Sequence, residues 1–128
     1  MSGYEYTLTM SKEQAHEVLN AVELLMRLKL NQYEVLPYTL INLDDPEYCE
    51  KRDDAIPLLR AGFNTLYRGK RSDEWKDQQW HRLYDLYQVL RKAIHDAEHP
   101  DTIGVDSGPV MCTAGEPMAK CEWGVKND

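Results

Sequence analysis

Three side chains in the last long amphipathic segment combine groups that could bind a base and a phosphate. Tyr84, Gln88 and Arg91 follow one another at spacings of four and three residues, which places them on one side of a helix. An aromatic ring can stack on a base, an amide can pair with a polar edge, and a guanidinium can hold two phosphate oxygens. Arg27 and Gln32, in the first helical segment, offer a second set of donors. A solvated helix flank with Tyr84 packed in the core would produce the same pattern without a ligand.

The C-terminal part of the chain adds two turns that suit contact with oxygen atoms of a ligand. Residues 106–109 (DSGP) and 113–117 (TAGEP) are rich in Gly, Pro and small polar residues, and they include Asp106 and Thr113. Such turns expose backbone N–H groups that can approach phosphate or ribose oxygens closely. They are equally common as connections of β-hairpins.

Motifs of known enzymes are missing from the sequence, which contains no GxSxG, GxGxxG, P-loop or HExxH. His95 and His99 are four residues apart, but two histidines at a helix end without a third ligand are usually surface residues. Cys112 and Cys121 fall in expected strands, where cysteines are usually buried and inert. We therefore expect a binding protein that is not an enzyme and holds no metal or cofactor.

Composition limits the class of partner. The 128 residues include 15 Lys+Arg and 22 Asp+Glu, for a net charge of -7, which argues against general affinity for DNA or RNA. The length predicts a single domain, residues 1–128. No apolar run approaches the roughly 18 residues of a membrane span, and the N-terminus does not resemble a signal peptide. Three cysteines cannot all pair within one chain, so we expect free thiols in a reducing cytoplasm.

Three helices are expected to position the candidate residues. The first begins at a capping box, Ser11 to Gln14, and is stopped by Pro37. The second lies between Asp53 and Gly69, with Pro57 near its start, and residues 38–52 before it form a loop or short turn. The third runs from about 74 to 98.

Short extended segments are expected at both ends of the chain. Residues 4–10 alternate apolar and polar side chains, and residues 103–105, 110–112 and 118–123 are short and apolar between turns. A lone strand has no partner for its backbone, so the first should pair with those of the tail. The predicted fold is α+β, with a small antiparallel sheet packed against two long helices and one shorter helix.

The first helix carries more apolar surface than one face requires. Ala21, Leu24 and Leu28 widen the stripe that contains Val22 and Leu25. A second chain, in a homo-oligomer, could cover this width. A neighbouring helix of the same chain could also cover it.

Four fragments are similar to small phage proteins of the first Thoeris anti-defence family. They are YTLTMSKEQA (6–15), MRLKLNQYE (26–34), DLYQVLR (85–91) and GVDSGPVMCTAGEPMAKCE (104–122). The resemblance implies a sponge in the host cytoplasm that sequesters cyclic ADP-ribose isomers made by TIR-domain defence proteins, without degrading them. Some members also hold cyclic trinucleotides. It further implies a homo-oligomer, a dimer or a hexamer, with ligands near subunit interfaces.

The same resemblance implies ligand-binding residues on the matching fragments. The family is expected to carry a basic residue before the TAGE turn, whereas this chain has Met111 and Cys112 there. Another cation must replace it, or the range of ligands differs. The implied residues are Arg27, Gln32, Asp85, Gln88, Arg91, Asp106 and Thr113, and Tyr84 joins them from the helical pattern.

Two other functions remain open at this point. An acidic protein that blocks a host defence enzyme would explain the carboxylate pairs at 44–45, 53–54 and 73–74, although solvated acidic loops explain them equally. A hydrolase acting on the same nucleotide signal is a third possibility.

Overall fold

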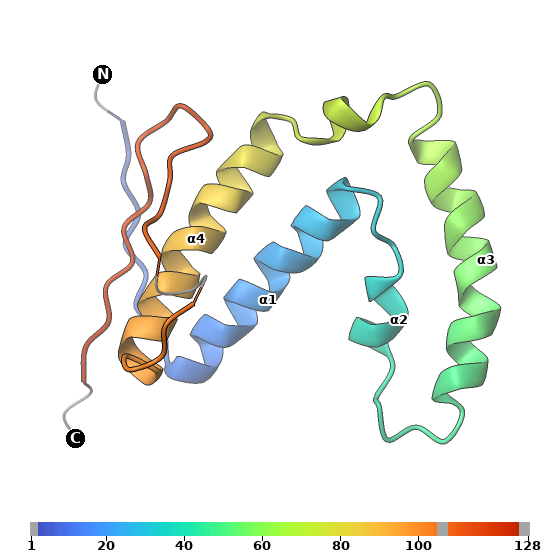
Figure 1. The fold of residues 1–128 in the computed structure, drawn as a ribbon, viewed down its shortest axis with the longest axis horizontal. Coiled ribbons are helices and arrows are strands. Elements are labelled where there is room, and N and C mark those ends of the chain that lie inside the picture. The colour runs from blue at the N-terminus through green and yellow to red at the C-terminus, as the bar shows by residue number, and fades with distance from the viewer. Residues whose placement is uncertain (1–2, 105–107, 126–128) are drawn as a thin grey trace.

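The computed structural model describes residues 3–104 and 108–125 of the chain. Within these residues the chain is helical, and no strand is present (Figure 1). The elements are α1 (Lys12–Lys29), α2 (Val35–Leu40), α3 (Tyr48–Leu66), the 3-10 helix η1 (Ser72–Trp75) and α4 (Gln78–Glu98).

The helices form two pairs that stand as the legs of an arch (Figure 1). In one leg α1 packs antiparallel against α4, and in the other α2 packs against α3. Ion pairs tie both ends of the first leg, from Lys29 Nζ to Asp77 Oδ2 and from His16 Nε2 to Glu98 Oε2, each at 2.8 Å. The segment that contains η1 connects the legs across the top of the arch.

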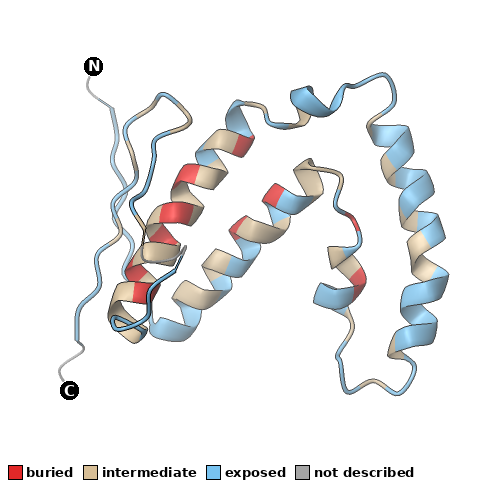
Figure 2. Ribbon diagram, viewed as in Figure 1, coloured by how far each residue is buried: buried red, intermediate tan, exposed pale blue. Residues whose placement is uncertain are grey.

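The apolar core lies in the first leg. Val22 and Met26 of α1 pack with Trp80 and Leu90 of α4, and the buried residues of Figure 2 are concentrated on these two helices. Tyr84 stacks on Trp80 with ring centroids 5.1 Å apart. In contrast, α3 has no buried residue. The core therefore positions α4 firmly and leaves the second leg largely exposed.

The predicted capping box at the start of α1 is confirmed. Ser11 Oγ accepts the Gln14 backbone N–H at 3.1 Å, and Gln14 Oε1 accepts the Ser11 backbone N–H at 3.0 Å. These bonds satisfy two donors at the helix terminus. Asp77 caps α4 in the same way, by accepting the Trp80 N–H at 2.9 Å.

Two predicted helix boundaries are wrong, both at prolines. The first helix ends at Lys29, before a turn in which Asn31 has a positive φ of 62°, and Pro37 lies in the separate helix α2. Pro37 is the third residue of α2. Backbone N–H groups in the first turn of a helix have no partner within the helix, so the missing N–H of proline breaks no hydrogen bond there. Pro57 lies inside α3, which begins at Tyr48. It is exposed there, so water can replace the missing hydrogen bond. Residues predicted as a loop, 38–52, are therefore partly helical.

The predicted α+β fold is also wrong for the part of the chain that the structure describes. Residues 3–10 and 108–125 are extended and lie on the same side of α4, but they do not form a sheet (Figure 1). Tyr4 and Tyr6 are each 92% exposed and Leu8 is 74% exposed, so the alternating pattern buries no apolar face. The tail instead bonds to side chains of α4, as described below.

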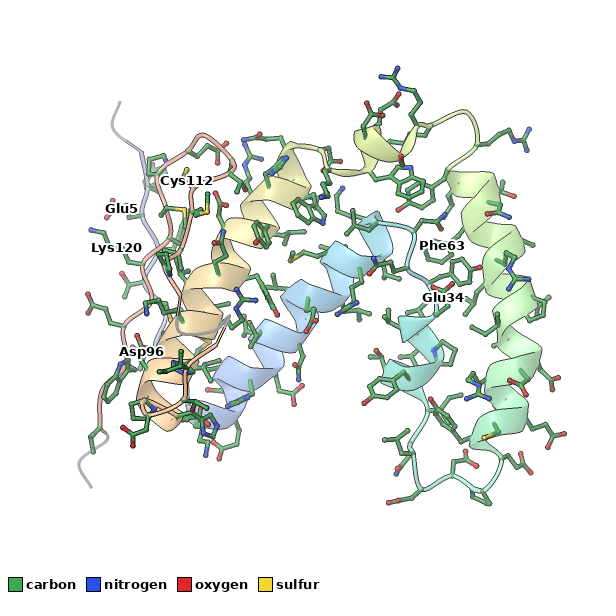
Figure 3. All side chains as sticks on the ribbon, viewed as in Figure 1. Glu5, Glu34, Phe63, Asp96, Cys112 and Lys120 are labelled. Carbon is green, nitrogen blue, oxygen red and sulfur yellow. The ribbon has the colours of Figure 1, made fainter. Side chains whose placement is uncertain are left out.

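Aromatic rings connect the two legs. Tyr33, which is buried, contacts Phe63 of α3 at 5.4 Å, and Tyr67 contacts Trp75 at 5.2 Å between ring centroids. The Tyr67 hydroxyl donates to the backbone carbonyl of Leu28. Figure 3 shows Phe63 on the side of α3 that faces the chain just before α2. We refer to residues 35–66, which contain α2 and α3, as the arm.

Candidate functional site

The polar side of α4 holds the C-terminal segment through Gln88. Its Nε2 donates to the Met111 carbonyl at 2.8 Å, and its Oε1 accepts the Met111 N–H at 2.9 Å. The amide thus satisfies both backbone groups of Met111, as a neighbouring strand would. Gln88 is buried, so both ends of its amide are already used inside the chain.

Asp85, one turn earlier on α4, binds the turn that follows. Its carboxylate accepts the Thr113 hydroxyl at 2.7 Å and the backbone N–H groups of Thr113 and Ala114 at 2.9 and 3.0 Å. Burial raises the pKa of Asp85, but these hydrogen bonds lower it more, and the pKa lies below its ordinary 3.8. The backbone donors that the sequence offered to a ligand are therefore occupied by Asp85.

A charged contact fixes the end of the same turn. Arg82 donates to both carboxylate oxygens of Glu116, at 2.6 to 3.0 Å, and Gln78 Nε2 donates to Oε1 at 3.0 Å. These bonds, first from Arg82 and then from Gln78, lower the pKa of Glu116 from 4.5 to about 2. Farther along α4, His95 Nε2 lies 2.8 Å from the Thr102 carbonyl oxygen. We refer to Gln78, Arg82, Asp85 and Gln88 as the tail clamp.

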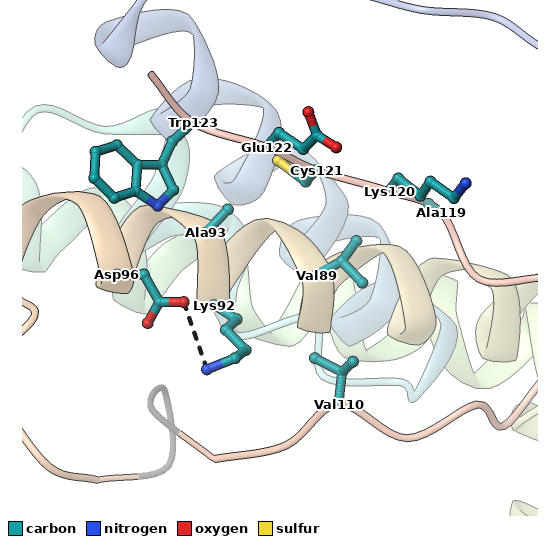
Figure 4. Close-up of a pocket in the computed structure, with 10 residues that line it drawn as sticks. All are labelled: Val89, Lys92, Ala93, Asp96, Val110, Ala119, Lys120, Cys121, Glu122 and Trp123. Atoms are coloured by element: carbon teal, nitrogen blue, oxygen red, sulfur yellow. Dashed lines mark ion pairs between the residues drawn. The ribbon is translucent and has the colours of Figure 1, made fainter. Parts of the chain in front are cut away.

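An open groove of about 620 Å³ lies beside the tail clamp, on the C-terminal half of α4 (Figure 4). Its floor is the ridge of Val89, Lys92, Ala93 and Asp96, which follow one another at helical spacing. Val110 bounds it on one side, and residues 119–123 bound it on the other. The tail clamp positions these walls because it fixes the stretch of chain between them.

The groove combines a flat ring with charges of both signs. The Trp123 side chain is 55% exposed, and Figure 4 shows its indole beside Ala93. Lys92 Nζ pairs with Asp96 Oδ2 at 3.5 Å, with both side chains partly exposed. Such a pair is weak and can exchange partners. Lys120 supplies a second ammonium group, and Glu122 a second carboxylate. The surface can therefore take a ligand with a ring and an anionic group.

The predicted residues of α4 and the tail do not line this groove. Tyr84 is part of the core, and the Arg91 guanidinium lies over the Tyr87 ring at 4.9 Å. Asp85, Gln88 and Thr113 bind one another or Met111 as described above. Asp106 lies outside the described residues.

The second predicted donor set lies at the opposite end of the leg. Arg27 donates to Glu23 at 2.9 Å and to Gln32 at 3.3 Å, close to the Lys29–Asp77 ion pair. Arg91 is fourteen residues beyond Asp77 along α4. At 1.5 Å per residue the two arginines are roughly 20 Å apart along the helix axis. The two predicted donor sets therefore lie at opposite ends of the first leg.

Sequence reasoning missed the three residues that give the groove its chemistry, namely Lys92, Lys120 and Trp123. A signal was present for each of them, since Lys120 lies within the family-like fragment 104–122. Lys92 follows the DLYQVLR fragment directly, and Trp123 follows the last family-like fragment in an otherwise polar stretch. Only the folded chain brings them together, because 26 residues separate Lys92 from the start of the second wall at 119.

Other features of the described residues complete the picture of the site. Across residues 3–104 and 108–125, no group of three or more His, Cys, Asp or Glu side chains is arranged to hold a metal ion. Nor does this part of the chain contain a helix long and apolar enough to cross a membrane. Comparisons with protein-family models, curated protein sequences and solved structures found no match to this chain.

Proposed function

We propose that the protein is a phage-encoded sponge that binds cyclic ADP-ribose-type nucleotides in the host cytoplasm without degrading them. One observation carries the proposal: all wall residues of the groove except Trp123 come from the segment 104–122, in which the resemblance to the anti-defence family is longest. Cyclic trinucleotides are the second ligand class under the same proposal. The assembly that goes with it is a homo-oligomer, a dimer or a hexamer.

The groove chemistry supports a ligand of this kind. A volume of about 620 Å³ lies within the range of roughly 300–1,000 Å³ that small-molecule sites occupy. In the proposed complex the Trp123 indole stacks on an adenine, and Lys92 and Lys120 bind the pyrophosphate. These lysines also supply the positive charge that Met111 and Cys112 do not provide before the TAGE turn.

The separation of the two arginines bears on the proposed assembly. Arg91 adjoins Lys92 and can reach a ligand at the edge of the groove, whereas Arg27 and Gln32 lie roughly 20 Å away. If all three contact one nucleotide, Arg27 and Gln32 come from a neighbouring copy. The proposal therefore places ligands where two chains meet.

Capture without turnover requires slow release of an intact ligand. The test is to incubate the protein with a cyclic ADP-ribose isomer, denature it by heat, and assay the supernatant. Return of the unaltered nucleotide after depletion supports a sponge. An altered nucleotide identifies an enzyme instead, and the absence of depletion contradicts nucleotide binding.

The alternative proposal is an acidic inhibitor that binds a host defence enzyme, and the charge excess of -7 favours it. Local contacts weaken it, since several of the predicted acidic groups are already neutralised. Asp45 pairs with Lys51 at 2.6 Å, Asp53 with Arg52 at 3.1 Å, and Asp73 and Glu74 with Arg71. Nucleotide depletion in the assay above decides against this alternative.

A further inference from the structure

The isolated chain exposes much more surface than a compact protein of its mass. Its accessible surface is 9969 Å² at 14.9 kDa. A compact monomer of that mass exposes about 7,000 Å², so the excess is about 3,000 Å². The extended termini account for part of it. The arm also contributes, since its longer helix α3 has no buried residue.

The exposed surface of the arm includes five large apolar side chains among its polar ones. Leu58 and Leu66 of α3 are each 75% exposed, as is Leu40 of α2, and Tyr38 and Leu43 are 65% and 62% exposed. Leu58 and Leu66 are eight residues apart, so they lie on neighbouring positions of one helix side, with Gly62 between them. Soluble monomers rarely expose so many large apolar side chains together.

A second uncovered apolar surface lies on α1. Val22 and Met26 face α4 and are buried, whereas Ala21 and Leu25, on the adjacent side of the helix, are exposed. Leu25 is 39% exposed, and of the three residues predicted to widen the stripe, Ala21 is exposed whereas Leu24 and Leu28 are half-buried. Within the described residues only α4 packs extensively on α1, so the arm does not cover this side in its own chain.

We infer that the arm is an assembly arm, which packs on α1 of a second copy of this chain. Two copies exchanging arms about a twofold axis would cover both apolar surfaces at once and leave neither free. A stable dimer buries roughly 1,200–2,000 Å² in total, and obligate dimers bury more, so the excess surface is ample for such an interface. The inference rests on the homo-oligomer proposed above, but it is independent of the ligand.

The experiment compares molar mass and affinity between variants by light scattering and sedimentation. In the double variant Leu58→Asp/Leu66→Asp, two carboxylates enter the interface, so the dissociation constant should rise roughly 30-fold or more. Asn64→Asp is the control, since it adds one negative charge on the opposite side of α3 and should leave assembly unchanged. Far-UV circular dichroism checks that α3 remains helical.

Hydrogen exchange of the unmodified chain provides a second measurement that does not depend on the variants. Amides of α3 should lose protection when the protein is diluted below its dissociation constant. A wild-type mass of 14.9 kDa at micromolar concentration overturns both the assembly and the arm. The role of the arm alone is contradicted if the double variant still forms the oligomer. It is also contradicted if dilution does not change the exchange protection of α3. Nucleotide depletion is measured separately, so failure of the arm and failure of nucleotide binding are distinguishable.

Discussion

Asp85 is the residue whose role differs most between sequence and structure, because a carboxylate predicted to face a ligand binds the chain's own tail. Replacing it with alanine would leave the backbone N–H groups of Thr113 and Ala114 without their acceptor. We expect Asp85→Ala to lower the free energy of unfolding by about 2–4 kcal/mol, measured by urea denaturation. Asp101→Ala, an exposed aspartate just beyond the end of the same helix, should change it by less than about 0.5 kcal/mol. Equal effects of the two variants would contradict the clamp.

Glu116 gives the tail clamp a dependence on pH. The folded-state pKa values of Glu116 and Asp85 lie below their ordinary values of 4.5 and 3.8, so their stabilisation is present above those values. It is lost as the pH falls, for Glu116 between 4.5 and about 2. We expect Glu116→Gln to lose less stability than the wild type between pH 5 and pH 3 in urea titrations. Glu122→Gln, a second exposed carboxyl of the tail, serves as the control and should follow the wild type.

Trp123 is the residue that tests the groove as a nucleotide site. Loss of one ring that stacks on a base costs about 1–3 kcal/mol, so Trp123→Ala should weaken binding of cyclic ADP-ribose isomers roughly 5- to 150-fold. The melting temperature of the Trp123→Ala protein should stay close to that of the wild type, because the indole is largely exposed. Trp123→Phe retains a ring and should bind with an intermediate affinity. Calorimetric titration measures all three proteins, and unchanged affinity in Trp123→Ala would remove the groove from the proposed function.

At the scale of elements, α3 departs from the usual rule for proline. Pro57 lies nine residues after the helix begins, and it cannot donate to the Asp53 carbonyl. We expect Pro57→Ala to raise the free energy of unfolding by on the order of 1–3 kcal/mol, since an interior proline costs about 3 kcal/mol relative to alanine. The measurement is urea unfolding followed by circular dichroism. Thr65→Ala, also exposed on α3, is the control, and a loss of stability in Pro57→Ala would mean that the proline shapes the arm.

At the scale of the whole molecule, the distance between Arg27 and Arg91 predicts sites shared by two chains. Arg27→Ala and Arg91→Ala should each bind nucleotide weakly as pure proteins. When the two variants are mixed and allowed to exchange subunits, half of the dimers contain one of each, and one of their two sites is intact. About a quarter of the wild-type sites should therefore return. Titration of the mixture measures this fraction. No recovery in a mixture that forms mixed dimers would show that the arginines do not share a ligand.

The sequence was sufficient for features that depend on neighbouring residues. The capping box needs only Ser11 and Gln14 at the correct spacing, and the place of Val22 on the apolar stripe of the first helix needs only helical periodicity. Both are present in the structure.

The tertiary structure decided which partners the polar residues find. The side chains of Gln88 and Asp85 could bind either a ligand or backbone groups of the same chain. In the structure they bind the tail, whose residues follow them by 23 to 29 positions in the sequence. Because these side chains satisfy backbone groups of Met111, Thr113 and Ala114, this part of the tail no longer needs a strand as its partner, and it stays extended without a sheet. The groove depends on the same contacts between α4 and the tail, because its walls form only where the tail is held against α4. Local sequence patterns determine where a helix forms and which of its sides is apolar. Contacts between distant segments depend on the whole chain, because the favoured arrangement is the one that leaves the fewest buried polar groups without a hydrogen-bond partner.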